Sequence, residues 1–254
     1  MSHIFYSNSS LPPLYIGARP DITFYQLMQL VEENVSPQDQ KRIYALREYI
    51  DVVNIKRVLK KQPIDTRGNF SEKELETAII EIEGVHPTVL EYLRTYESVE
   101  DRLAHFNRLL SNYLQTREEE SSGFLKAYYE HERMLRLSLV AYRCAKNGGD
   151  IVEELKFEDP KDPFIASLLA QKDTTHFDFP FELEMLTEKL AAASTPLDQY
   201  KVIFEHQFTF AEQEGQQRIF SLDFIMAYMM QLIAVENWEA TNEKTGTGII
   251  EGMV

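Results

Sequence analysis

The sequence predicts an all-α fold, a bundle of long amphipathic helices. Apolar residues recur at steps of three and four along most of the 254-residue chain, which is the spacing of one helical face. Several of these stretches begin at a Ser or Thr that precedes a proline or an acidic residue, a pattern typical of helix starts. Strand signals are weak, because only the N-terminal stretch and residues 177–181 favour extended backbone.

The first part of the chain is divided by prolines and glycines. Residues 1–20 are expected to be extended, because their prolines, glycine and serines break helices. A helix should begin near Asp21 or Thr23. The next helix should begin at Ser36-Pro37, with the serine as its N-cap, and should stop before Pro63.

Further helices follow a loop over residues 63–70. Ser71 and Glu74 have the spacing of a capping box, and His86-Pro87 marks another helix start. Residues 98–117 are predicted to form a single amphipathic helix whose inner face includes Val99.

The second half contains the longest apolar helices. Residues 124–145 carry apolar side chains on nearly every face, which predicts a central, well-covered helix that ends at Gly148. Two Asp-Pro pairs make residues 157–163 a joint, and the last long helix should begin at Ser221 or Asp223. The glycine-rich tail, residues 245–254, is expected to fray.

These boundaries predict three parts. Residues 1–20 form an extended segment, residues 21–156 a first helical subdomain, and residues 157–254 a second subdomain packed with the first as one unit.

Composition excludes several classes of function. The 41 acidic and 26 basic residues give a formal charge of −15, which repels phosphate backbones and argues against nucleic-acid binding. Cys144 is the single cysteine, so the chain cannot form an internal disulfide. No leader segment is apparent, and the apolar stretch 220–235 is shorter than the roughly 20 residues that span a bilayer.

One carboxylate in the central helix invites a chemical interpretation. Glu132 shares a face with Tyr128, Leu135 and Leu139, and Arg136 follows at the i,i+4 spacing that brings the two charges together. Glu132 is either an acid of raised pKa in a cleft or a structural charge paired with Arg136. We favour the structural interpretation.

No catalytic, cofactor or metal site is expected. The chain has no glycine-rich phosphate loop and no nucleophile-elbow motif. His131 lacks a Glu at the i,i+3 spacing of a di-iron carboxylate site, so the histidines are expected to be ordinary solvated side chains. Cys144 precedes a helix C-terminus, where the helix dipole disfavours a thiolate.

The final helix carries a stripe of aromatic and methionine side chains, from Phe224 to Trp238. Such a stripe forms either core packing or a groove for a partner, and the burial of most apolar stripes favours the core.

Three stretches resemble helices of the funnel-shaped coupling protein of V/A-type ATPases and ATP synthases, which is lettered C in bacteria and d in eukaryotes. They are REYIDVVNIKRVLKK at 47–61, YYEHERMLRLSLVAYR at 128–143 and FSLDFIMAYMMQLIAVENWE at 220–239. The start Ser9 to Leu14 is also similar. Together they identify the chain as a member of a bacterial family encoded alongside V-type ATPase subunits.

The resemblance implies a helical funnel, built as a repeat of helical subdomains, that couples the central stalk to the membrane rotor ring for ion transport and has no chemistry of its own. The expected partners are the other V-type ATPase subunits of the stalk and the ring, and the expected location is cytoplasmic, at the membrane periphery. A stand-alone α-helical adaptor or scaffold is the alternative. The matching positions are candidates for helix packing or subunit contacts: Asp51, Asn54, Lys56, Glu132, Arg133, Arg136, Asp223, Tyr228 and Trp238.

Overall fold

The computed structural model describes residues 11–174, 177–219 and 221–241, and this part of the chain is all-α, as predicted, with no strand. The predicted features at residues 1–10 and 245–254 lie outside the described residues. The elements are α2 (Phe24–Asn34), α3 (Pro37–Leu59), α4 (Glu72–Glu81), α5 (Pro87–Thr95), α6 (Val99–Ala104), α7 (Phe106–Glu120), α8 (Phe124–Asn147), α9 (Ile151–Glu154), α10 (Pro163–Leu169), the 3-10 helix η1 (Phe181–Leu183), α11 (Met185–Ala192), α12 (Pro196–Gln216) and α13 (Leu222–Ala240).

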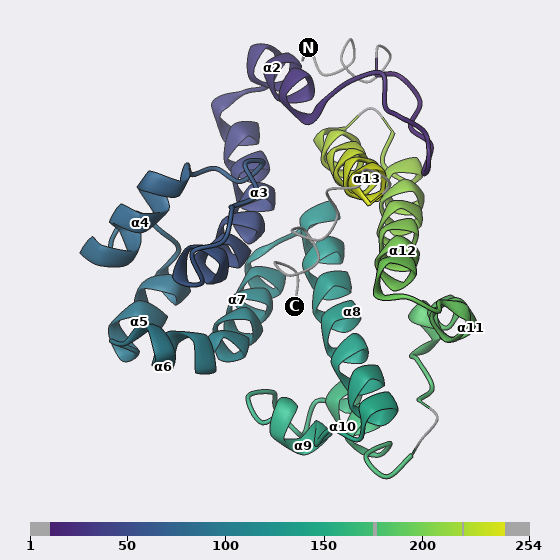
Figure 1. Cartoon of the computed structure of the whole chain (residues 1–254). Coiled ribbons are helices and arrows are strands. Elements are labelled where there is room, and N and C mark those ends of the chain that lie inside the picture. Colours follow the sequence, from purple (N-terminus) through teal and green to yellow (C-terminus); the bar gives the residue numbers. More distant parts are fainter. Residues whose placement is uncertain (1–10, 175–176, 220, 242–254) are drawn as a thin grey trace.

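The helices are arranged around α8 (Figure 1). Helices α3 to α7 lie on one side of α8, and the antiparallel pair α12 and α13 lies on the other. Helices α9 and α10 gather near its C-terminal end, and α11 lies beside the start of α12. The central position predicted for residues 124–145 is therefore confirmed.

Two hydrophobic cores share α8. The first core joins α2, α3, α4, α5 and α7 to the N-terminal turns of α8 and to α13. The second core joins the C-terminal half of α8 to the segment from α9 to α12. Because α13 belongs to the first core, the cores divide the chain differently from a single boundary at residue 157; the predicted subdomain division stays a prediction.

The predicted helix starts are confirmed by their caps. The hydroxyl of Thr23 accepts from the Gln26 amide, and Ser36 caps α3 with Pro37 in its first turn. Ser71 and Glu74 form the predicted capping box of α4. These caps satisfy backbone N–H groups that the first turn of a helix leaves unpaired.

The single helix predicted over residues 98–117 is wrong. The chain breaks at His105, whose ring stacks on Tyr96 with centroids 4.2 Å apart. Arg102 donates to the carbonyls of Leu93 and Tyr96 and so binds α6 to the end of α5. The side chain of Val99, expected on the inner face, is 43% exposed. Contacts with α5 thus override a continuous helical pattern.

Within the described residues, no helix combines the length and the apolar character needed to cross a bilayer.

Candidate functional site

Asp51 and Asn54 anchor the loop between α3 and α4. The Asp51 carboxylate accepts from the Asn69 amide at 3.0 Å, from the Asn69 side chain at 2.8 Å and from the Phe70 amide at 3.2 Å. The Asn54 side chain accepts from the Asp65 amide and donates to the Asp65 carbonyl, both at 2.8 Å. Burial raises the pKa of Asp51 to about 6, although these donors and Arg47 oppose the rise.

The same loop reaches across to α13 through Arg67. Its guanidinium binds Asp65 within the loop, Glu236 at 3.2 Å and the Asn237 side chain at 2.6 Å. The second carboxylate oxygen of Glu236 accepts from the Phe24 amide at 2.9 Å, at the first residue of α2. One loop therefore connects α2, α3 and α13, and Asp51 and Asn54 serve packing within the chain. Lys56, one turn further along α3, holds its ammonium 5.7 Å from the ring centroid of Phe106.

Asp223 connects three helices at the start of α13. Its carboxylate binds Arg42 of α3 at 2.5 Å and accepts from the Phe124 amide of α8 at 3.0 Å. Gly123 precedes that amide with φ of +61°, and a Cβ at this position would overlap Oδ2 of Asp223. The glycine allows the carboxylate to approach the first free amide of α8.

The aromatic and methionine stripe of α13 is part of the core, and the core interpretation is confirmed. Met229 is fully buried, and Tyr228 is 5% exposed and donates to the Pro12 carbonyl at 2.7 Å. The Trp238 indole lies against Gly17, and the Lys201 ammonium lies 4.5 Å from its ring centroid.

The predicted Glu132–Arg136 pair is wrong. Arg136 donates to Glu158 at 2.9 Å. Arg133 binds Glu158 at 3.4 Å and Asp162 at 2.8 Å. The joint over residues 157–163 supplies a carboxylate that is closer to the guanidinium than the partner one turn away on the same helix.

Glu132 instead faces α12, where it accepts from the Gln207 side chain at 2.9 Å. Burial raises the pKa of Glu132 to about 7, and the bond from Gln207 opposes this rise. Its neighbour His131 stacks on Phe210 with centroids 3.7 Å apart and lies 5.0 Å from the ring of His206. Burial lowers the pKa of His131 to about 3 and that of His206 to about 4.

The expectation of solvated histidines is therefore wrong for His131, which is 7% exposed. Residues from two helices close this polar layer, and neither helix alone carries a sequence signal for it. No three His, Cys, Asp or Glu side chains come together as metal ligands in the described part of the chain.

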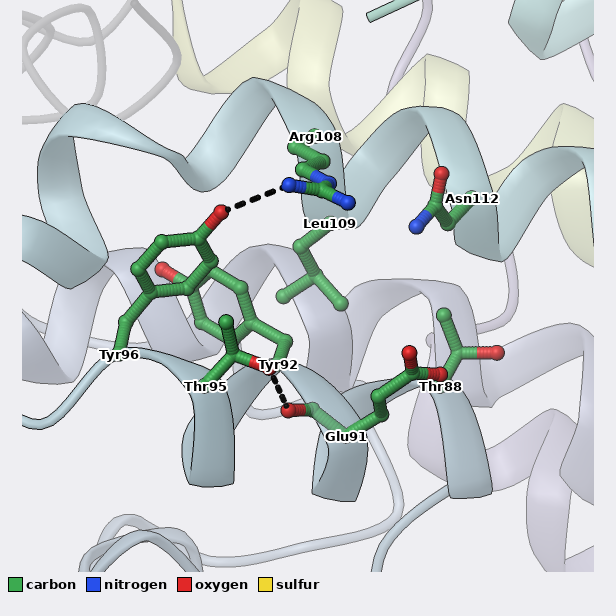
Figure 2. A pocket seen from close by; sticks show the side chains of 8 residues that line it. All are labelled: Thr88, Glu91, Tyr92, Thr95, Tyr96, Arg108, Leu109 and Asn112. Carbon is green, nitrogen blue, oxygen red and sulfur yellow. Dashed lines mark hydrogen bonds between the residues drawn. The ribbon is translucent and has the colours of Figure 1, made fainter.

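A small polar pocket lies between α5 and α7 (Figure 2). It is lined by side chains that include Glu91, Tyr92 and Asn112, and Arg108 donates across it to the Tyr96 hydroxyl at 3.2 Å. Its volume of about 30 Å³ has room for one or two water molecules. A pocket of this size does not accommodate an organic substrate.

A second hollow, of about 620 Å³, lies at η1 and the start of α11. Phe181 and Met185, which we call the 181–185 patch, line it and are 86% and 69% exposed. Sequence reasoning missed these residues, although a signal exists. The segment has one apolar stripe at Leu183, Leu186 and Leu190, which is buried, and a second at Phe181 and Met185, four residues apart.

The fold and these sites define a class: an all-α protein whose buried polar clusters connect its helices and whose apolar surface is most concentrated at the 181–185 patch. The chain belongs to the family described as "Protein of unknown function (DUF2764)", which matches residues 1–254. An uncharacterized protein of Chlamydia muridarum is 24% identical over 93% of this chain and 92% of its own length. One from Chlamydia trachomatis is 22% identical over 96% of this chain and 95% of its own length. No solved structure matches the chain.

The family assignment corrects the resemblance drawn from the sequence. The matching family is one of unknown function, its relatives above are described only as uncharacterized, and neither points to the coupling protein of a V/A-type ATPase. The likeness rested on acidic and basic residues placed within apolar helices. Asp51, Arg133 and Arg136 acquire such positions here by binding loops of the same chain, which any helical protein can require.

Proposed function

We propose that this protein is a non-catalytic α-helical adaptor that binds another protein. The observation that carries the proposal is the 181–185 patch. Phe181 and Met185 are large apolar side chains, both mostly exposed, and they line the same hollow. Contiguous apolar surface of this kind marks interaction sites on proteins, whereas single exposed apolar residues are ordinary.

The energetics favour a partner at this position. Complete burial of one Phe or Met side chain contributes about 1.5 to 3 kcal/mol. The neighbouring aromatic residues Phe177 and Phe179 are buried in the second core, so the exposure of Phe181 is not a general property of this segment. The polar clusters at Asp51, Asp223 and Glu158 bind helices and loops to one another and so give the patch a rigid support.

The narrower expectation of a rotor-coupling role in a V-type ATPase lost the resemblance on which it rested. No finding tests that role itself, and it stays a prediction. Its partners, the proteins of the central stalk and the rotor ring, would be recognised in the experiment that tests the adaptor.

That experiment purifies the full chain, at native expression level, from its own cells and quantifies the proteins that accompany it. We expect a protein in near-stoichiometric amount with the wild-type chain and with Ile80→Ala, which alters a side chain that is 79% exposed on α4. The double variant Phe181→Ala/Met185→Ala should lose that protein at least about tenfold, because truncated hot-spot residues cost this much affinity. Equal recovery with all three chains would refute the proposal.

A further inference from the structure

We propose that the 181–185 patch binds a basic amphipathic helix of the partner, with apolar side chains against Phe181 and Met185 and with Lys or Arg side chains against the acidic rim. This inference rests on the proposed adaptor function and names the chemistry of its partner. The hollow has apolar and acidic walls together, formed by Phe179, Phe181, Met185, Asp178, Glu184 and Glu188.

The acidic rim follows from the register of α11. Glu184 and Glu188 lie four residues apart, beside Met185, and both are exposed. Asp178 and Glu182 are also exposed on the preceding segment. The nearest cation on α11, Lys189, is bound to Glu205 at 3.3 Å. Four carboxylates therefore surround two apolar side chains, and the ammonium on the same helix is already held by a carboxylate of α12.

Charge and shape together select the occupant. An anionic lipid surface would be repelled by the carboxylates and by the chain's net charge of −15. A second copy of the chain would bring the same acidic rims together, which is also repulsive. A helix with an apolar face and flanking basic residues matches the apolar walls and the rim at once, and helix-in-groove binding uses anchors at i and i+4, the spacing of Phe181 and Met185.

The test uses defined probes and the full chain. The first probe is a labelled 18-residue helix with Leu on one face and Lys on the other. The second is a scrambled peptide of the same composition that has no continuous apolar face, and the third replaces every Lys by Glu. Affinities are measured by fluorescence anisotropy in 50 mM and 500 mM salt.

The variants are matched between two helices. Phe181→Ala/Met185→Ala removes the apolar anchors, and Ile80→Ala on α4 is its control. Glu184→Gln/Glu188→Gln removes two rim charges at i,i+4. Its control is Glu72→Gln/Glu76→Gln, which removes the same number of charges at the same spacing from exposed positions of α4. Both pairs change the net charge equally, so a difference between them reports position.

We expect the Leu/Lys helix to bind the wild-type chain at least about tenfold more tightly than either other peptide does. Both 181–188 variants should weaken it at least about fivefold, both α4 controls should leave it unchanged, and high salt should weaken it. Equal binding of the scrambled peptide, or equal effects of the α11 and α4 variants, would show attraction by net charge alone and overturn the inference. Patch-dependent binding of anionic vesicles, or patch-dependent dimerisation in sedimentation, would also overturn it.

Failure here is distinguishable from failure of the adaptor function. A native partner that is lost with Phe181→Ala/Met185→Ala but kept with Glu184→Gln/Glu188→Gln would sustain the adaptor and overturn the basic helix.

Discussion

Gly68 lies directly against the Asp51 carboxylate, so closely that a Cβ on the glycine would overlap Oδ1 of the aspartate. The absence of a side chain at residue 68 lets the loop reach α3, where Asp51 accepts from the amides of Asn69 and Phe70. A buried carboxylate that is bound by backbone amides in this way fixes the course of a loop. The geometry predicts that the glycine and the aspartate act as a unit.

Gly68→Ala should lower the free energy of unfolding by about 1 to 3 kcal/mol, the usual cost of inserting a methyl group into a packed site. The reason is displacement of Asp51 and loss of its bonds to the loop. Urea denaturation checks this. If Gly68→Ala unfolds at the wild-type urea concentration, the loop does not depend on the contact with Asp51.

Gly123→Ala should destabilise the chain more than Gly84→Ala does. Both glycines have positive φ, +61° and +78°, so both variants incur backbone strain of about 1 to 2 kcal/mol. A Cβ at Gly84 has no neighbour within 4 Å, whereas a Cβ at Gly123 meets Asp223. The difference between the two variants, measured by urea denaturation, therefore reports the junction of Asp223 with Arg42 and α8. Equal losses would show that this junction tolerates displacement.

Glu132→Gln should stabilise the protein at alkaline pH and leave it unchanged below pH 4.5. Burial raises the pKa of Glu132 from 4.5 to about 7, so the folded state binds a proton more tightly than the unfolded state does. Stability is therefore complete below pH 4.5 and is lost as the pH rises through 7. Glutamine can still accept the bond from Gln207. With about 1.4 kcal/mol for each pKa unit, the gain at pH 8 approaches about 3 kcal/mol.

Thermal unfolding of the wild type and Glu132→Gln across pH 4 to 8.5 provides the measurement. A constant difference between the two melting temperatures over this range would contradict the titration of a buried carboxyl group.

His131→Phe should remove a loss of stability that occurs in acid. Burial lowers the pKa of His131 from 6.5 to about 3, so the unfolded state binds the proton more tightly. The contribution of His131 is complete above pH 6.5 and is lost as the pH falls toward 3. Phenylalanine keeps the stacking with Phe210 and does not titrate. At pH 5 the variant should gain about 2 kcal/mol relative to its difference from wild type at pH 7.5.

Urea denaturation at pH 5 and pH 7.5 tests this prediction. The opposite slopes of Glu132 and His131 between pH 4.5 and 6.5 offset each other in the wild type, so the single variants are the informative proteins. A His131→Phe chain with the same pH dependence as the wild type would place the acid sensitivity elsewhere.

The sequence by itself determined the helical class, the caps at Thr23, Ser36 and Ser71, and the central place of α8. These follow from local physics, because capping bonds and apolar periodicity depend on neighbours within a few residues. Only the tertiary structure decided the partners of the polar residues. Arg136 binds Glu158 rather than Glu132, and His131 meets His206, because burial and long-range contacts between helices set which charges can be neutralised.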